Sequence, residues 1–141
     1  MTLSIVCDYS RFPSDISWAV WHGFASFGYS PSFYIADTII RHIRTYNVRD
    51  DWTFSGGDIL VELKGEEEGK PVGLKLDVNG NIFSTGPGGI WICTPEGDIL
   101  GRIKIPEKTS NLAWGETGYS SLYITASTGL YKIHCRTSGS Y

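Results

Sequence analysis

Apolar and polar residues alternate over short runs along most of this chain, which is the pattern of β-strands with one face on a core. Three such runs have the same character: Phe33 to Thr38, Ile82 to Pro87, and Leu122 to Ser127. A second β-rich run follows each of them within a dozen residues, at 43–48, 90–95 and 130–135. The chain therefore contains a repeat whose units begin at residues 33, 82 and 122.

A repeat of about 40 residues with several short strands is the spacing of β-propeller blades. The first predicted blade spans 18–63, the second spans 71–105, and the third spans 110–135 and lacks a fourth strand. A lone outer strand is predicted at 1–8, within one domain over 1–141. Because a closed ring commonly takes about four to eight blades, three repeats predict a partial propeller.

One stretch is ambiguous. Trp18, Trp21, Phe24 and Phe27 recur every three residues, as in an amphipathic helix, whereas the repeat predicts a strand over His22 to Phe27. We adopt the strand. Composition supports an all-β chain, since 17 glycines and 6 prolines suit many tight turns and only one Met is present among 141 residues.

Charge and hydropathy narrow the possible partners. The net charge is −3 and no basic stripe is present, so we expect no nucleic-acid partner. The first residues lack the basic and apolar regions of a secretory signal, and no apolar run is long enough for a membrane span. We therefore expect a cytoplasmic protein without membrane contact. Cys7, Cys93 and Cys135 lie in apolar strand patterns and are interpreted as small core side chains.

From Pro71 to Ile92, and again at Ser110 to Gly115 and Leu122 to Ala126, the chain resembles the senescence marker protein, gluconolactonase and luciferin-regenerating enzyme family. Phe33 to Thr38 with Ile43 to Val48 is similar to an earlier blade of the same family. The resemblance implies a six-bladed propeller that hydrolyses sugar lactones or related esters with one divalent metal, often calcium. This chain would correspond to its C-terminal half.

The resemblance also implies where the metal ligands should lie, and this sequence departs from the family there. His22 stands where the family has the Asn of an Asn-Gly phrase, and Val72 where it has the Asp of a Pro-Asp-Gly phrase. Calcium prefers oxygen ligands, which neither side chain supplies. His22 remains the candidate metal ligand, for a softer ion such as zinc, unless it is a hydrogen-bonded residue in an aromatic cluster.

Four residues are candidate substrate ligands, because the repeat places them on one rim at the strand ends: Asp37, Thr85, Ser110 and Asn111, with Thr125 beside them. The alternative for Asp37 is a turn residue whose carboxylate caps backbone N–H groups.

The leading functional prediction is a gluconolactonase-like hydrolase for a lactone or sugar-like ligand, with activity impaired by the altered metal positions. The alternative is a non-catalytic propeller fragment that binds a small ligand or a partner protein. Two copies could associate head to tail, each supplying three of six blades.

Overall fold

The computed structural model describes residues 19–25 and 31–140, with side chains from residue 31 onward. Its regular structure consists of β-strands and one short 3-10 turn, Thr117–Tyr119. The strands are β1 Ala19–Ala25, β2 Ser32–Asp37, β3 His42–Val48, β4 Phe54–Glu62, β5 Leu74–Leu76, β6 Ile82–Gly86, β7 Gly89–Cys93, β8 Ile99–Lys104, β9 Thr109–Gly115, β10 Ser121–Ala126 and β11 Leu130–His134. No helix in this part of the chain has the length and apolar character needed to cross a membrane.

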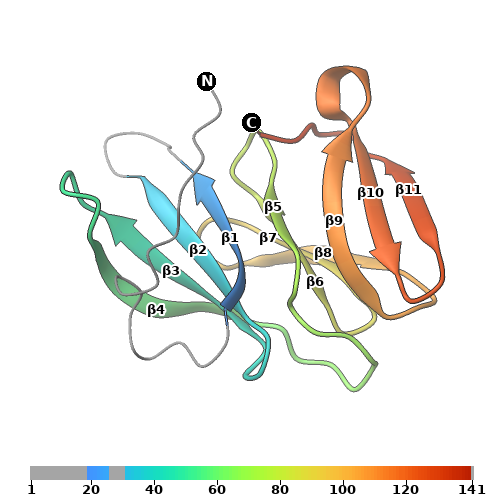
Figure 1. Cartoon of the computed structure of the whole chain (residues 1–141), viewed down its shortest axis with the longest axis horizontal. Helices are drawn as coiled ribbons and strands as arrows, with labels where there is room; N and C mark the ends of the chain where they lie inside the picture. The colour runs from blue at the N-terminus through green and yellow to red at the C-terminus, as the bar shows by residue number, and fades with distance from the viewer. Residues whose placement is uncertain (1–18, 26–30, 141) are drawn as a thin grey trace.

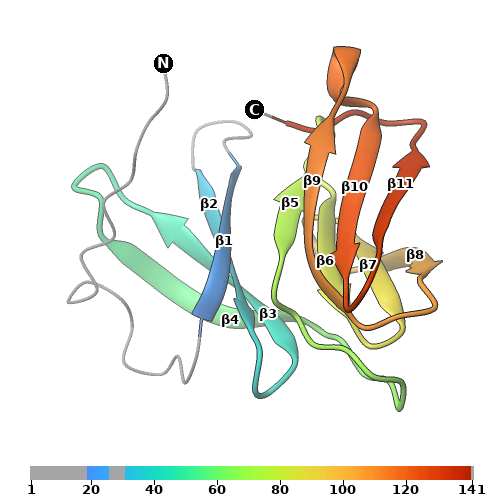
Figure 2. The same cartoon turned by 45° about the vertical axis from the view of Figure 1, so that its right-hand side comes forward.

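The strands form three antiparallel sheets that follow each other along the chain (Figure 1). Sheet 1 contains β1 to β4, sheet 2 contains β5 to β8, and sheet 3 contains β9 to β11. The first strands of the sheets are neighbours, with β1 beside β5 and β5 beside β9. The sheets fan out from these inner strands (Figure 2). This arrangement confirms the prediction of a partial all-β propeller.

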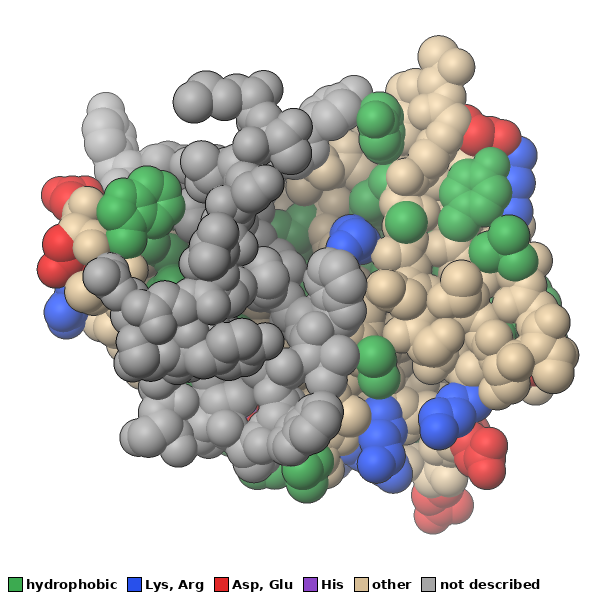
Figure 3. All heavy atoms as spheres, viewed as in Figure 1, with side chains coloured by type: hydrophobic (Ala, Val, Ile, Leu, Met, Phe, Trp, Pro, Cys, Tyr) green, Lys and Arg blue, Asp and Glu red, His purple; other side chains and the backbone are tan. Residues whose placement is uncertain are grey.

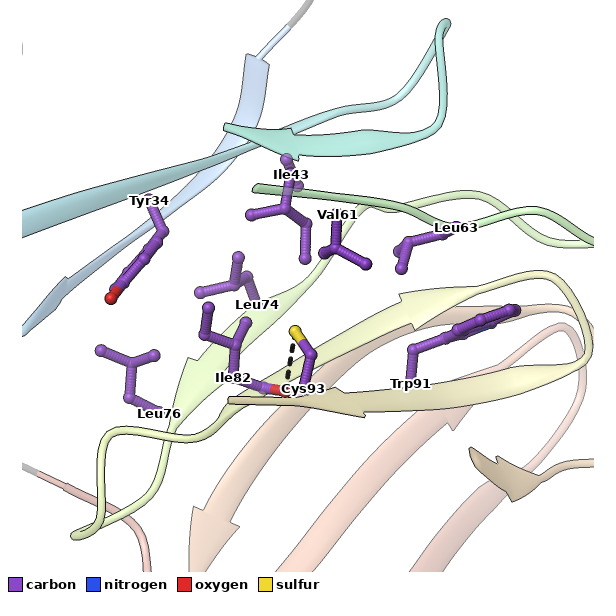
Figure 4. Close-up of a cluster of buried hydrophobic side chains, with 10 residues drawn as sticks. Tyr34, Ile43, Val61, Leu63, Leu74, Leu76, Ile82, Trp91 and Cys93 are labelled. Carbon is purple, nitrogen blue, oxygen red and sulfur yellow. Dashed lines mark hydrogen bonds between the residues drawn. The ribbon is translucent and has the colours of Figure 1, made fainter. Parts of the chain in front are cut away.

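Sheets 1 and 2 are joined by a buried apolar layer (Figure 4). Alternate residues of the strands point into it, because side chains of a strand alternate between its two faces. Sheet 1 contributes Tyr34, Ala36, Ile43, Val61 and Leu63, and sheet 2 contributes Leu74, Leu76, Ile82, Trp91 and Cys93. Cys93 is buried in this layer, which confirms the interpretation of this cysteine as a core side chain, and its burial raises the pKa of the thiol to about 12.

The opposite face of sheet 2 packs on sheet 3. Phe83, Ile90 and Ile105 meet Leu112, Leu122 and Ile124 in a second buried cluster. The ring of Trp114 packs edge-on against Phe83 at a centroid distance of 5.0 Å. Sheet 2 is thus apolar on both faces, which explains why its strands contain more consecutive apolar residues than a half-solvated sheet would.

The strands lie in the runs where the repeat predicted them, but β1, β4 and β9 begin three or four residues earlier than predicted. The aromatic stretch that could have been a helix contains strand β1, which begins at Ala19, three residues earlier than predicted. Sheet 3 has three strands in the described part of the chain. The predicted lone strand over 1–8 lies outside the described residues and stays a prediction.

The C-terminal residues do not follow the repeat, because they return to the inner strand of sheet 2. Ser140 N donates to Leu76 O at 3.0 Å, and Val78 N donates to Ser138 O at 2.9 Å. Gly139 forms a β-bridge with Asp77. This segment, residues 137–140, therefore connects the β5–β6 turn to the last sheet, close to the C-terminus in Figure 1.

Candidate functional site

One edge of the three sheets collects the ends of their second strands and the beginnings of their first strands. In sheet 2, β5 begins at Leu74 and pairs antiparallel with β6, which ends at Gly86. In sheet 3, β9 begins at Thr109 opposite the end of β10. We call this edge the rim. It is the place where the sequence predicted the substrate ligands.

Thr85 lies at the rim but is fully buried. Its hydroxyl accepts hydrogen bonds from the N–H groups of Val72 and Gly73, at 2.8 and 3.0 Å, and donates to Lys70 O at 2.9 Å. These three bonds fix the chain that enters β5, which gives Thr85 a structural role. Its predicted role in substrate binding remains untested.

Ser110 and Asn111 lie at the beginning of β9. The Ser110 hydroxyl is 3.2 Å from the hydroxyl of Thr125 and is exposed. Asn111 Oδ1 accepts a hydrogen bond from Leu112 N at 2.8 Å. A side chain on Gly73 would come within 2.5 Å of Asn111 Oδ1, so the absence of a Cβ lets the beginnings of β5 and β9 approach each other. The structure thus brings Ser110, Asn111 and Thr125 together beside sheet 2.

Asp37 ends β2 and is buried. Its Oδ1 accepts hydrogen bonds from the N–H groups of Ile39 and Ile40, at 2.9 and 3.0 Å, as expected for a carboxylate that caps a turn. Its Oδ2 lies 4.0 Å from Nε2 of His42, the residue paired with Asp37 across β2 and β3. These contacts give Asp37 the turn-forming role that the sequence left as its alternative.

His42 is a buried rim residue that the sequence reasoning passed over, since three histidines far apart in the chain suggest no site. Its Nε2 accepts a hydrogen bond from Arg44 Nε at 3.0 Å. Burial and the neighbouring Arg44 guanidinium lower the pKa of His42 below its ordinary value of 6.5. The one feature of the sequence that could have indicated His42 as a rim residue is its position directly after the predicted turn between the second and third strands, opposite Asp37.

The backbone of His22 lies inside β1, paired with Ile35. The neighbouring pair Trp21 and Ala36 corresponds in register to Asn111 and Thr125 in sheet 3. The register therefore places His22 one residue further along β1 than the rim position that Asn111 occupies in β9. Its role as a metal ligand stays a prediction.

The described residues do not fit a calcium ion. Val72 is half-buried at the position where the family resemblance implies an aspartate, and its side chain offers no oxygen. Among residues 31–140, no three His, Cys, Asp or Glu side chains lie close enough together to hold a metal ion.

A groove of about 830 Å³ lies at the same edge of sheets 2 and 3, lined by residues that follow β6 and β10 and precede β9, among them Gly88, Lys108 and Thr128. Glu107, one of its lining residues, accepts hydrogen bonds from Thr128 N at 2.7 Å and the Tyr131 hydroxyl at 2.8 Å. Glu67 forms an ion pair with Arg102 across 3.3 Å. These carboxylates hold loops together.

On the face shown in Figure 3, basic and acidic side chains are interspersed, without a large patch of one sign.

The lowered pKa of His42 predicts a pH-dependent stability. Below pH 6.5 the unfolded chain takes up a proton that the folded chain resists, so the free energy of unfolding should fall as the solution is acidified. One such proton changes stability by at most about 1.4 kcal/mol per pH unit. Urea unfolding at pH 7.5 and 5.5 should show a smaller loss in His42→Gln than in the wild type. His134→Gln, at an exposed position of β11, should behave like the wild type.

Comparison with known proteins agrees with this architecture. The family model for the SMP-30/gluconolactonase/LRE-like region matches residues 30–128. A gluconolactonase from Zymomonas mobilis is 38% identical over 73 residues, which cover 50% of this chain and 20% of that protein. An X-ray structure of a protein assigned as a gluconolactonase is 30% identical with a TM-score of 0.70, covering 77% of this chain and 36% of the other.

Regucalcin, a calcium-binding protein from Agrobacterium tumefaciens, has the same fold with a TM-score of 0.67 and 16% identity. The match covers 78% of this chain and 44% of regucalcin. This chain thus spans less than half the length of each of these relatives. The sheets, the ordered repeats and the family match over residues 30–128 together show that this chain belongs to the SMP-30/gluconolactonase/LRE-like family.

Proposed function

We propose that the rim of this chain binds a sugar lactone or a related ester as part of a gluconolactonase-type propeller. The observation that supports this proposal is the cluster of Ser110, Asn111 and Thr125 beside the beginning of β5. Hydroxyl and amide groups at the rim can form hydrogen bonds with the several hydroxyl groups of a sugar ring. A gluconolactonase is similar in sequence, and a structure assigned as a gluconolactonase shares the fold.

In that family chemistry a bound divalent ion would supply Lewis-acid polarisation of the lactone carbonyl, and a carboxylate would serve as the base for water. Val72 replaces the expected carboxylate, so we propose that hydrolysis by this chain is impaired at that step. Under this proposal its own residues would supply binding and orientation: the Ser110 hydroxyl and the Asn111 amide, at the beginning of β9, would contact the sugar, and Thr85 holds the entry to β5 in place. A cytoplasmic location also remains a proposal.

Substitution of Val72 by aspartate tests this interpretation. We expect Val72→Asp to bind calcium more tightly than the wild type, by about tenfold or more, because it adds a carboxylate oxygen where the family carries one. Titration calorimetry with calcium, manganese and zinc gives the affinity, and gluconolactone hydrolysis above the spontaneous rate gives the activity. Val78→Asp is the matched control, since Val78 is 48% exposed in the β5–β6 turn, away from the rim.

The two readouts separate the possible functions. Lactone hydrolysis that rises in Val72→Asp, and falls when Asn111→Ala is added, would support a lactonase rim. Lactone binding without hydrolysis in either protein would indicate a binding module. Neither binding nor hydrolysis, in a protein that remains folded, would contradict the proposal.

A further inference from the structure

The groove at the edge of sheets 2 and 3 is lined by four segments that lie far apart in the sequence. They are residues 67–68 before β5, residue 88 in the β6–β7 turn, residues 104–108 between β8 and β9, and residues 127–128 in the β10–β11 turn. Its volume of about 830 Å³ falls within the range of small-molecule sites, which is about 300–1,000 Å³. The groove is therefore large enough for an organic ligand bigger than one sugar ring.

Backbone hydrogen bonds hold these segments against one another. Gly88 N donates to Glu68 O at 3.0 Å, and Ile105 N donates to Gly88 O at 3.2 Å. On the side of sheet 3, Ser127 N donates to Lys108 O at 3.1 Å. A site whose backbone is fixed before the ligand arrives loses less conformational entropy on binding. The shape of the groove is thus set by the fold and does not depend on a ligand.

The groove adjoins the rim cluster of Ser110, Asn111 and Thr125. Lys108 lines the groove and lies two residues before Ser110 in the chain. Ser127 lines it from the paired strand end, two residues after Thr125. Two residues of an extended chain span about 7 Å. A ligand held by the rim cluster therefore has the groove directly beside it.

The groove offers polar groups that the protein does not use for its own structure. Among the described residues, the ammonium groups of Lys104 and Lys108 and the carboxylate of Glu68 form no hydrogen bond or ion pair. All three side chains are exposed. Three carboxylates and two ammonium groups line the groove, and this small excess of negative charge disfavours phosphate or another anion. A neutral ligand with many hydroxyl groups suits this lining better.

We propose that the groove is a second sugar-binding subsite, so that the rim takes a lactone carrying a further glycosyl unit, such as the lactone of a disaccharide. This inference rests on the proposed function, since the rim would hold the lactone ring. Sugar hydroxyls both donate and accept hydrogen bonds, which matches Lys104 and Lys108 as donors and Glu68 as acceptor. The exposed ring of Pro106, between the two lysines in sequence, offers an apolar contact for the C–H groups of the sugar.

An amide NMR titration of the isotope-labelled full chain with cellobiose and with glucose tests the proposal. Neither sugar is a lactone, so binding is read without turnover. We expect cellobiose to bind about tenfold more tightly than glucose, the gain from one hydrogen bond to a charged group. Cellobiose should shift the amide signals of Lys108, Ser127 and Thr128 in the groove together with those of Ser110 and Asn111 at the rim. Glucose should shift only the rim signals.

Lys108→Ala should remove the preference for cellobiose and leave the affinity for glucose unchanged. This variant keeps the backbone carbonyl that accepts the hydrogen bond from Ser127 N, so the groove retains its shape. Lys64→Ala is the matched control. Lys64 is an exposed lysine that pairs with Glu62 and does not line the groove, so its variant should keep the tenfold difference.

The outcomes separate this inference from the proposed function. Equal affinities for the two sugars, with shifts confined to the rim, would overturn the inference and leave the proposed function intact. A preference for cellobiose that Lys108→Ala does not reduce would also overturn it, because the second sugar would then lie elsewhere. Absence of any rim shift with either sugar, in a protein that remains folded, would count against the proposed function and the inference together.

Discussion

Gly89→Ala is expected to lower the free energy of unfolding by about 3–4 kcal/mol. Gly89 begins β7 with φ 142°, a conformation that residues with a Cβ rarely adopt. A methyl group there would collide with the carbonyl oxygen of Ile103 and lie 2.9 Å from the backbone nitrogen of Ile105. Ile103 lies in the adjacent strand β8 and Ile105 directly follows it. Because both are backbone atoms, the collision is relieved only if β8 moves away.

The consequence reaches beyond one turn, because β7 and β8 form the outer half of the central sheet and Ile90 next to Gly89 packs against sheet 3. Gly101→Ala provides the control in the facing strand. A Cβ on Gly101 would meet no atom within 4 Å, and its φ is an ordinary one, so we expect a change within about 0.5 kcal/mol. Urea denaturation of both variants measures the difference. Equal stability losses would show that the close approach at Gly89 carries no cost.

Asp77→Ala is expected to reduce stability by about 3 kcal/mol, because Asp77 is a buried carboxylate that joins two distant parts of the chain. Its Oδ1 accepts hydrogen bonds from Asn79 N at 2.9 Å and Asn81 N at 2.8 Å. Its Oδ2 accepts from Asn81 Nδ2 at 3.0 Å and from the Thr137 hydroxyl at 2.9 Å. Alanine would leave these donors without their acceptor and release residues 137–140 from β5.

Two further variants show how much of the stability loss in Asp77→Ala comes from the bond to the C-terminal segment. Thr137→Val removes the two bonds of the Thr137 hydroxyl, which donates to Asp77 Oδ2 and accepts from Asn79 Nδ2 at 3.4 Å, and should cost about 1 kcal/mol. Asp98→Ala alters an exposed turn aspartate in the same sheet and should change stability by less than about 0.5 kcal/mol. Hydrogen exchange at Ser140 N, which donates to Leu76 O, reports release of the segment directly. Full protection of this amide in Asp77→Ala would show that the carboxylate does not hold the C-terminal segment.

The local pattern of apolar and polar residues was sufficient to predict the strands, because each repeat forms its own hairpins. Phe33 to Asp37, Ile82 to Gly86 and Leu122 to Ala126 alternate between two faces, and turn residues such as Asn79 and Gly80 separate them from their neighbours. Alternation of this kind is a property of consecutive residues and needs no distant contact. The least certain stretch, around β1, was the one whose aromatic spacing also fits a helix.

The rim could be predicted only in part. The repeat placed Thr85, Ser110 and Asn111 at the same edge, but it could not show that the hydroxyl of Thr85 is already used by Val72 and Gly73. Nor could it show that the Asp37 carboxylate turns back to cap Ile39 and Ile40. Residue type indicates which hydrogen bonds a side chain can make, and only the surrounding fold determines which partners reach it.

By itself the sequence determined the all-β class, the three repeated sheets and the family, because these follow from periodicity and from the order of short phrases along the chain. Only the tertiary structure revealed the pairing of residues 138–140 with β5 and the groove at the edge of sheets 2 and 3. Both depend on contacts between residues far apart in the chain. The free energy of such contacts comes from surfaces that do not exist until the sheets have packed.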